Sequence, residues 1–234
     1  MTVVVNLHRE GLIAKRAIES ALRAIAVAEN HKIKCEMICV LDSPDSVTKS
    51  VVDGHPKVGR TLNVEFKDLS KSRNLATAES SGRFIAFLDG DDLWGENWLL
   101  SAYTMMISTG SERYVLHPKL NLYFGRGMEP YFWVHPDMRF ENISLYDIAA
   151  ANRWTALSFS SRNLYLKYKF PAADLSFGFG YEDWAWNYQT MRDGILHVTV
   201  DEGIHFIRRK RCGSMIEKAN NRLALPMLSK LPFD

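Results

Sequence analysis

Strand-like and helix-like segments alternate along the first part of this chain. Four short segments rich in β-branched or apolar residues have the length of strands, at 2–5, 37–41, 61–66 and 84–88. From Ile13 to Ala28, apolar residues recur every three or four positions, which indicates an amphipathic helix. A second helix is expected at 70–80, where Gly82 follows. This alternation predicts an α/β fold with a doubly wound, mostly parallel sheet.

The second part of the chain is more mixed. We expect a helix at 98–107, an extended segment at 114–124, and a short helix at 182–192 that ends before Gly194. The 234 residues are 47% hydrophobic, enough for one good-sized core, and repeats and Pro/Ser/Gly-rich linkers are absent from the sequence. A formal net charge of only +2 gives no electrostatic case for nucleic acid as a partner. We therefore expect a single domain over 1–234.

The spacing of the cysteines and the length of the apolar runs indicate in which cellular compartment the protein works. If 35–39 lies in a strand, Cys35 and Cys39 are about 13 Å apart, too far for a disulfide, and Cys212 is the third cysteine. This usage favours a reducing compartment. The apolar runs fall short of the roughly 20 residues that span a bilayer, and Val3–Val5 is too short for the core of a signal peptide. We expect a cytoplasmic protein.

Carboxylates gather where the expected strand 84–88 ends. Asp89, Asp91 and Asp92 fall within four residues, and in an α/β sheet ligands bind beyond the carboxyl ends of the strands. Hard oxygen ligands at this density suit Mg²⁺ or Mn²⁺ bound together with substrate phosphates. The alternative is a polar turn in which Asp92 caps a helix.

The segment 72–94 carries a family resemblance. Its sequence, SRNLATAESSGRFIAFLDGDDLW, resembles the hallmark segment of family 2 glycosyltransferases of the GT-A fold, in which an arginine-asparagine helix, a strand and a DxD motif follow in that order. The likeness runs from Val3 to about Ser214. It implies a Rossmann-like, mostly parallel sheet flanked by helices, with a smaller mixed acceptor-side region.

The resemblance also implies an activity and a division of the chain. A sugar would move from a nucleotide diphosphate donor, with a UDP-sugar favoured, to a hydroxyl of a glycan or glycolipid in surface polysaccharide biosynthesis. Residues 1–95 would bind the nucleotide sugar, 96–208 would hold the acceptor and the catalytic base, and 209–234 would form a basic loop and a tail.

The family's donor site maps onto this sequence residue by residue. The resemblance implies that Asp89 holds the donor ribose or sugar, that Asp91 ligates Mn²⁺ or Mg²⁺ with Asp89 beside it, and that Asp42 meets the base. His8 stands where the family usually has a stacking aromatic residue, and an imidazole can also stack. His205 stands where some GT-A enzymes place a further metal ligand, although a lone histidine on an apolar strand is commonly a core residue. The nucleotide-sugar residues implied in this way are His8, Glu10, Asp42, Arg73, Asp89, Arg208 and Arg209.

Two later segments resemble the rest of the family's active site. In GFGYEDWAWNYQ, the family's ED motif assigns the catalytic base to Asp183, with Glu182 as the alternative. Acidic residues are also favoured in any first helical turn. The cluster 208–211 resembles the basic loop that closes over the diphosphate, although its side chains can also be solvated or face anionic lipid.

Aromatic residues supply candidates for the acceptor site. Aromatic faces suit the CH faces of sugar rings, and core packing is the alternative for most of these side chains. The candidates are Tyr131, Trp133, Trp154 and Trp184.

The sequence leaves alternatives for the tail and for the function. The segment 223–233 carries apolar residues that either fold back on the core or dock on a partner, on a neighbouring domain or on the inner face of the membrane: Leu225, Met227, Leu228, Leu231 and Phe233. A sugar nucleotidyltransferase usually has a glycine-rich loop after the first strand, whereas only Gly11 occurs here. A non-catalytic glycan-binding or scaffold module that retains the fold is the other alternative.

Overall fold

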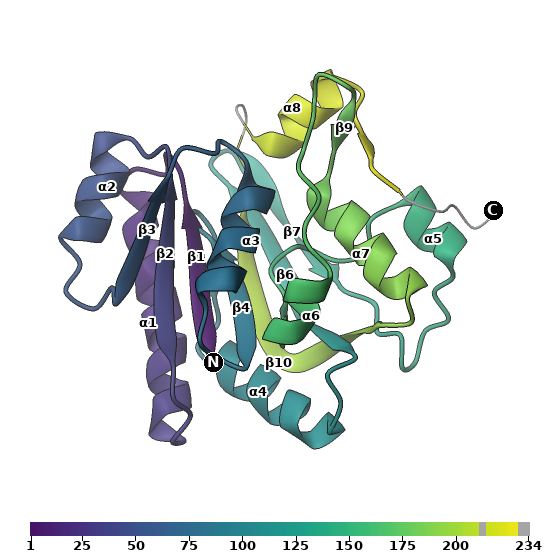
Figure 1. Cartoon of the computed structure of the whole chain (residues 1–234), viewed down its shortest axis with the longest axis horizontal. Coiled ribbons are helices and arrows are strands. Elements are labelled where there is room, and N and C mark those ends of the chain that lie inside the picture. Colours follow the sequence, from purple (N-terminus) through teal and green to yellow (C-terminus); the bar gives the residue numbers. More distant parts are fainter. Residues whose placement is uncertain (211–213, 229–234) are drawn as a thin grey trace.

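A curled central sheet organises the computed structural model, which describes residues 1–210 and 214–228 (Figure 1). The strands of this sheet are β1 Thr2–Leu7, β2 Glu36–Asp42, β3 Arg60–Val64, β4 Phe84–Asp89, β5 Leu93–Trp94, β6 Tyr114–Gly125, β7 Met128–Val134, β8 Phe159–Ser161 and β10 Leu196–Arg208. Their order is β3-β2-β1-β4-β8-β6-β10-β5, and β7 pairs with β6. Two short strands, β9 Phe179–Gly180 and β11 Leu225–Pro226, pair with each other beside it.

Helices cover both faces of the sheet. The helices are α1 Ile13–Asn30, α2 Ser46–Asp53, α3 Leu69–Glu79, α4 Trp98–Thr109, α5 Leu145–Ala150, α6 Arg162–Lys167, α7 Glu182–Arg192 and α8 Met215–Asn221. The apolar stripe of α1 packs with α4 on one face, where it meets Val3 and Val5 of β1. On the other face, α3, α6 and α7 pack over Val4. Side-chain alternation along β1 therefore divides the core between two layers.

The first half follows the sequence expectation closely. β1, β2, β3 and β4 are parallel neighbours, as the alternation of strands and helices predicts. The expected helix at 70–80 is α3, which begins after Asp68 because that side chain accepts a hydrogen bond from the Lys71 N–H at 3.1 Å. The expected strand at 61–66 is shorter, because β3 ends at Val64. The α/β prediction is confirmed.

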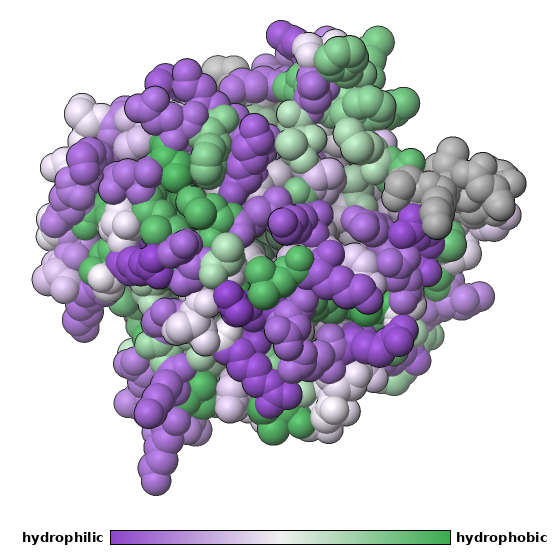
Figure 2. All heavy atoms as spheres, viewed as in Figure 1, coloured by the Kyte–Doolittle hydropathy of each residue, from purple (hydrophilic) through white to green (hydrophobic). Residues whose placement is uncertain are grey.

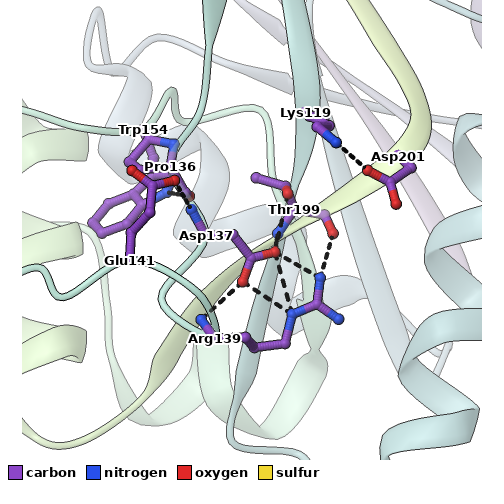
Figure 3. Close-up of polar contacts among 8 residues, drawn as sticks. All are labelled: Lys119, Pro136, Asp137, Arg139, Glu141, Trp154, Thr199 and Asp201. Carbon is purple, nitrogen blue, oxygen red and sulfur yellow. Dashed lines mark hydrogen bonds and ion pairs between the residues drawn. The ribbon is translucent and has the colours of Figure 1, made fainter.

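The second half adds antiparallel strands to this frame. β8 is antiparallel to both β4 and β6, and β10 runs parallel to β6. The loop after β7 is fixed to β10 by Asp137, whose carboxylate accepts hydrogen bonds from Arg139 and from the N–H of Thr199 at 2.9 Å (Figure 3). In the same view, Trp154 donates its indole N–H to the carbonyl of Pro136 at 2.9 Å.

Histidines lie in the core of this second half. His117 and His197 share a hydrogen bond of 2.9 Å between their rings, and His135 packs edge-on against His117. Burial lowers the pKa of His135 and of His197 to about 3, and it lowers the pKa of His117 and of His205 well below its ordinary value. These rings are therefore neutral in the folded protein.

We expect the histidine NMR signals to report this neutrality. From pH 8 to pH 5 the ring shifts of His117, His135, His197 and His205 should stay constant in the folded protein, whereas in urea the same residues should titrate near 6.5. Because only the unfolded chain takes up these protons, the contribution of the rings to stability falls as the pH drops from 6.5 toward 3. Titration of the four signals in the folded protein would contradict the burial described here.

Candidate active site

Three parallel strands end at the same edge of the sheet. β1, β2 and β4 lie side by side, so His8, Asp42 and Asp89 come together, as the sequence predicts. The ring Nδ1 of His8 contacts the backbone carbonyl of Asp42, and the backbone N–H of His8 donates to Glu10 Oε2 at 2.6 Å. The loop after β1 is thereby fixed against the end of β2.

Asp42 closes the loop between β3 and α3. Its carboxylate accepts the backbone N–H groups of Lys67 at 2.8 Å and of Asp68 at 3.0 Å, and the hydroxyl of Ser72 at 3.2 Å. Alternation along β2 turns this side chain toward the face that α3 covers. A direct contact of Asp42 with a nucleotide base stays a prediction.

Arg73 joins the two halves of the chain. Its side chain, from α3, is only 1% exposed. One terminal nitrogen donates to both oxygens of Asp89, at 3.1 and 3.2 Å, and the other donates to Glu182 at 3.1 Å. Burial lowers the pKa of this guanidinium, but the carboxylates of Asp89 and Glu182 raise it by more, so the pKa of Arg73 lies above its usual value. Arg73 therefore holds the DxD segment beside the ED motif.

Asp183 follows Glu182 at the start of α7. Burial and the neighbouring charge of Glu182 raise the pKa of Asp183 to about 7, although Arg73 acts in the opposite direction. The position at a helix N-terminus also favours negative charge. A carboxyl group with a pKa near neutrality can accept a proton and later release it.

The other two aspartates of the acidic segment differ from Asp89. Asp91 forms an ion pair with Lys210 at 2.7 Å and lies 3.9 Å from Arg208. Asp92 is buried and accepts the N–H of Arg208 at 2.7 Å, and burial with the charges of Asp91 and Asp89 raises the pKa of Asp92 well above its usual value. The end of β10 is thus docked on the acidic segment.

Close packing explains the glycine in this segment. A Cβ atom on Gly90 would lie 2.6 Å from the side chain of Leu7 and 2.9 Å from the carbonyl of Asn6. Glu10 lies against the same position, 3.3 Å from it. Burial raises the pKa of Glu10, and the nearby charge of Asp91 adds to this effect. Glu10 therefore belongs to the acidic cluster.

His205 and Trp154 lie in the core rather than at the site. The His205 ring is fully buried, stacked on Trp94 and edge-on to Trp98 with ring centroids 4.7 Å apart. Trp154 is also fully buried, and its ring stacks on His117. Both rings fill interior space, which is the alternative that the sequence left open for each, and the roles of His205 as a metal ligand and of Trp154 as an acceptor contact stay predictions.

The other acceptor candidates lie at or near the surface. Tyr131 is 47% exposed and stacks on Tyr123. The guanidinium carbon of Arg209 lies over the Tyr131 ring, 5.2 Å from the ring centroid. Trp133 follows on the same strand and is half-buried. Trp184 is half-buried, and its indole N–H donates to the carbonyl of Ile148 at 2.5 Å. Their role in acceptor binding stays a prediction.

Some predicted residues fall outside the described ranges. They are Arg211 of the basic cluster, Cys212, and Leu231 and Phe233 of the tail. Cys35 and Cys39 are free thiols, consistent with the sequence expectation. Leu225 and Met227 are exposed, whereas Leu228 packs against the cluster around Tyr188. Figure 2 shows apolar groups over the projecting part of the molecule that holds α8 and β9.

Sequence patterns did not single out two asparagines beside Asp183. Asn152, in the loop after α5, donates to Asp183 Oδ2 at 2.9 Å, and Asn187 of α7 donates to Asn152 Oδ1 at 3.0 Å. The position of Asn187, four residues after Asp183 on one helix face, is the only signal that sequence offered.

Comparison with known proteins identifies the family. The chain matches the glycosyl transferase family 2 over residues 2–168 and belongs to that family. A relative from Escherichia coli, the UDP-Glc:alpha-D-GlcNAc-diphosphoundecaprenol beta-1,3-glucosyltransferase WfgD, is 38% identical over 72 residues. That match covers 30% of this chain and 28% of WfgD.

Solved structures show the same fold. S. aureus TarS superposes with a TM-score of 0.66 at 17% identity over 89% of this chain and 36% of that chain. TarS 1–349 in complex with UDP-GlcNAc gives 0.65 at 18% identity, covering 92% and 60%. The mannosyltransferase PcManGT from Pyrobaculum calidifontis, in complex with GDP-Man and Mn²⁺, gives 0.62 at 14% identity, covering 91% and 57%. The chain thus has the GT-A fold and spans less than two thirds of these proteins.

Two further observations bear on metal and membrane. Within 1–210 and 214–228, no three His, Cys, Asp or Glu side chains are placed to hold an ion together. Among the helices of that same part of the chain, none is both long and apolar enough to cross a membrane.

Proposed function

We propose that this chain transfers a sugar from a nucleotide diphosphate to a hydroxyl group of a glycan or glycolipid. The observation that carries the proposal is the contact of one buried guanidinium, Arg73, with both Asp89 and Glu182, because it sets a proton acceptor, Asp183, beside the DxD segment. Family membership supports the donor class. The names of WfgD and of the TarS complex, with UDP-Glc and UDP-GlcNAc, favour a UDP-sugar.

The acceptor class and the location are parts of the same proposal. WfgD acts on a diphosphoundecaprenol-linked sugar, which supports a glycolipid acceptor in surface polysaccharide biosynthesis. Nucleotide sugars are made in the cytosol, so we place the reaction on the cytoplasmic side, at the inner face of the membrane where such an acceptor is presented.

In the proposed mechanism, the acceptor oxygen attacks the anomeric carbon of the donor. Asp183 accepts the hydroxyl proton, the new C–O bond forms, and the bond to the diphosphate breaks. Attack opposite the leaving group inverts the anomeric configuration. Asp89 orients the donor, and Arg208 and Lys210, which lie on the acidic segment, offset the charge of the diphosphate.

A divalent cation fits the donor set of this edge. Asp91 and Asp89 would hold Mn²⁺ or Mg²⁺, because carboxylate oxygens suit these ions, and the ion would take the place of the Lys210 ammonium that now contacts Asp91 at 2.7 Å. When bound, the ion supplies positive charge for the diphosphate. The remaining ligands would come from the substrate.

A thermal shift experiment tests donor and metal together. With UDP, GDP and dTDP, each with and without Mn²⁺, we expect one nucleotide to raise the Tm by about 5 °C at about a hundredfold excess over Kd, and only with the metal. Asp91→Ala should abolish the rise. Asp53→Ala removes a surface Asp–Lys pair of similar length, 2.9 Å, on α2, and should keep it.

The outcomes separate the parts of the proposal. An equal rise in Tm without metal would contradict the proposed divalent cation. If no nucleotide raises the Tm, the proposed nucleotide diphosphate donor is wrong. Hydrolysis of the matching UDP-sugar by the wild-type chain would exclude a non-catalytic glycan-binding module.

A further inference from the structure

We propose that Asn152 is a positioning residue that holds the carboxylate of Asp183 in the orientation needed to take the acceptor proton. This inference rests on the proposed role of Asp183 as the base. Asn152 lies in the loop that follows α5, far from α7 in sequence, and its amide Nδ2 is 2.9 Å from Asp183 Oδ2. The contact joins the acceptor-side loop to the base.

The orientation of the Asn152 amide is fixed by its neighbours. Asn187 is 1% exposed, and its Nδ2 lies 3.1 Å from the backbone carbonyl of Trp154, which only accepts hydrogen bonds. The same Nδ2 lies 3.0 Å from Asn152 Oδ1. Because Asn187 must donate to Trp154, it also donates to Asn152, and the Asn152 group that faces Asp183 is the N–H donor.

The Asn152 N–H gives the two oxygens of the Asp183 carboxylate different roles. Oδ2 accepts from Asn152, and the proposal assigns the other oxygen, Oδ1, to the substrate hydroxyl. A hydrogen bond to the ionised form favours that form, so this donor acts against burial and the charge of Glu182, which raise the pKa of Asp183. It also limits rotation of the carboxylate, and orientation of this kind contributes to rate.

The loop does not depend on this single contact. Trp184 donates to the carbonyl of Ile148, and Trp154 is buried and bonded to Pro136. Asn152 itself is half-buried. Removal of its amide should therefore leave the loop anchored, so that a variant reports on the base and not on folding.

The test is the pH dependence of kcat with the full chain, its donor and its acceptor. In the wild type we expect kcat to fall below about pH 7, as Asp183 is protonated. Asn152→Ala should lower kcat by about 10- to 100-fold at pH 7 and move this acidic limb upward by at least about half a pH unit. Asn152→Asp, which sets a carboxylate against Asp183, should move it further and recover part of its activity at high pH.

A matched control separates this role from a general loss of polar contacts. Asn163 of α6 donates to the Glu112 carboxylate at 3.2 Å on the protein surface, which is the same pair of groups at a position that the proposed mechanism does not use. Asn163→Ala should keep both kcat and the acidic limb. Each of the three variants should still unfold in one cooperative transition well above the assay temperature, which shows that the variant is folded when kcat is measured.

Two results would overturn the inference. One is an unchanged kcat in Asn152→Ala, and the other is a lower kcat with the acidic limb unmoved, which would indicate a structural role only. Failure of the proposed function is seen separately, as full activity of an Asp183→Asn variant or as a wild-type chain that turns over no donor.

Discussion

Asp183→Asn is expected to lower kcat for sugar transfer by about 10³-fold, because asparagine has the shape of aspartate but cannot take the acceptor proton. The side chain is held by Asn152, next to Glu182 and Arg73. Since the pKa of Asp183 is raised to about 7, the wild type should lose activity as the pH falls through 7 and regain it on return. The residual rate of the variant should lack this limb. Product formation measured from pH 5.5 to 9 tests both expectations.

Glu182→Gln is the control for this substitution. Glu182 is the neighbouring carboxylate, and its contact is with Arg73 at 3.1 Å. We expect a smaller loss of kcat than in Asp183→Asn and an acidic limb that persists but moves to lower pH, because the charge of Glu182 raises the pKa of Asp183. Full activity of Asp183→Asn together with an inactive Glu182→Gln would transfer the role of base to Glu182.

Local patterns explain why the donor half could be predicted from sequence. The strands β1, β2 and β4 are short apolar runs, the helix α1 has one apolar stripe, and connections between parallel strands place their carboxyl ends together. Each of these signals lies within about twenty residues. The meeting of His8, Asp42 and Asp89 therefore follows from patterns that need no long-range information.

Contacts between distant segments were not predictable in this way. Arg73 and Glu182 are 109 positions apart, and Asn152 and Asp183 are joined only because α5 packs beside α7. The burial of Trp154 and His205 depends on which strands enclose them, and an apolar environment in the sequence does not settle whether a ring faces the core or a substrate. Tertiary packing decided these positions.

Arg73→Met is expected to destabilise the protein by about 3 kcal/mol, because it removes a buried cation and leaves Asp89 and Glu182 without their partner. Methionine fills a similar length and can remain packed on Phe170, over whose ring the guanidinium now lies at 5.3 Å. Urea unfolding of the variant at pH 7 measures the loss. Arg60→Met is the matched control on the neighbouring β3, since its pair with Glu79 of α3 is exposed, and it should cost less than about 1 kcal/mol.

The same substitution should also change catalysis in a direction that stability alone does not predict. Arg73 lowers the pKa of Asp183 against burial and Glu182, so its removal raises that pKa above about 7 and moves the acidic limb of kcat to higher pH. We therefore expect Arg73→Met to recover part of its activity at pH 8.5 to 9. This recovery would indicate that Arg73 links the two halves of the site electrostatically. If the variant is as stable as Arg60→Met and its limb stays in place, Arg73 does not couple the DxD segment to the base.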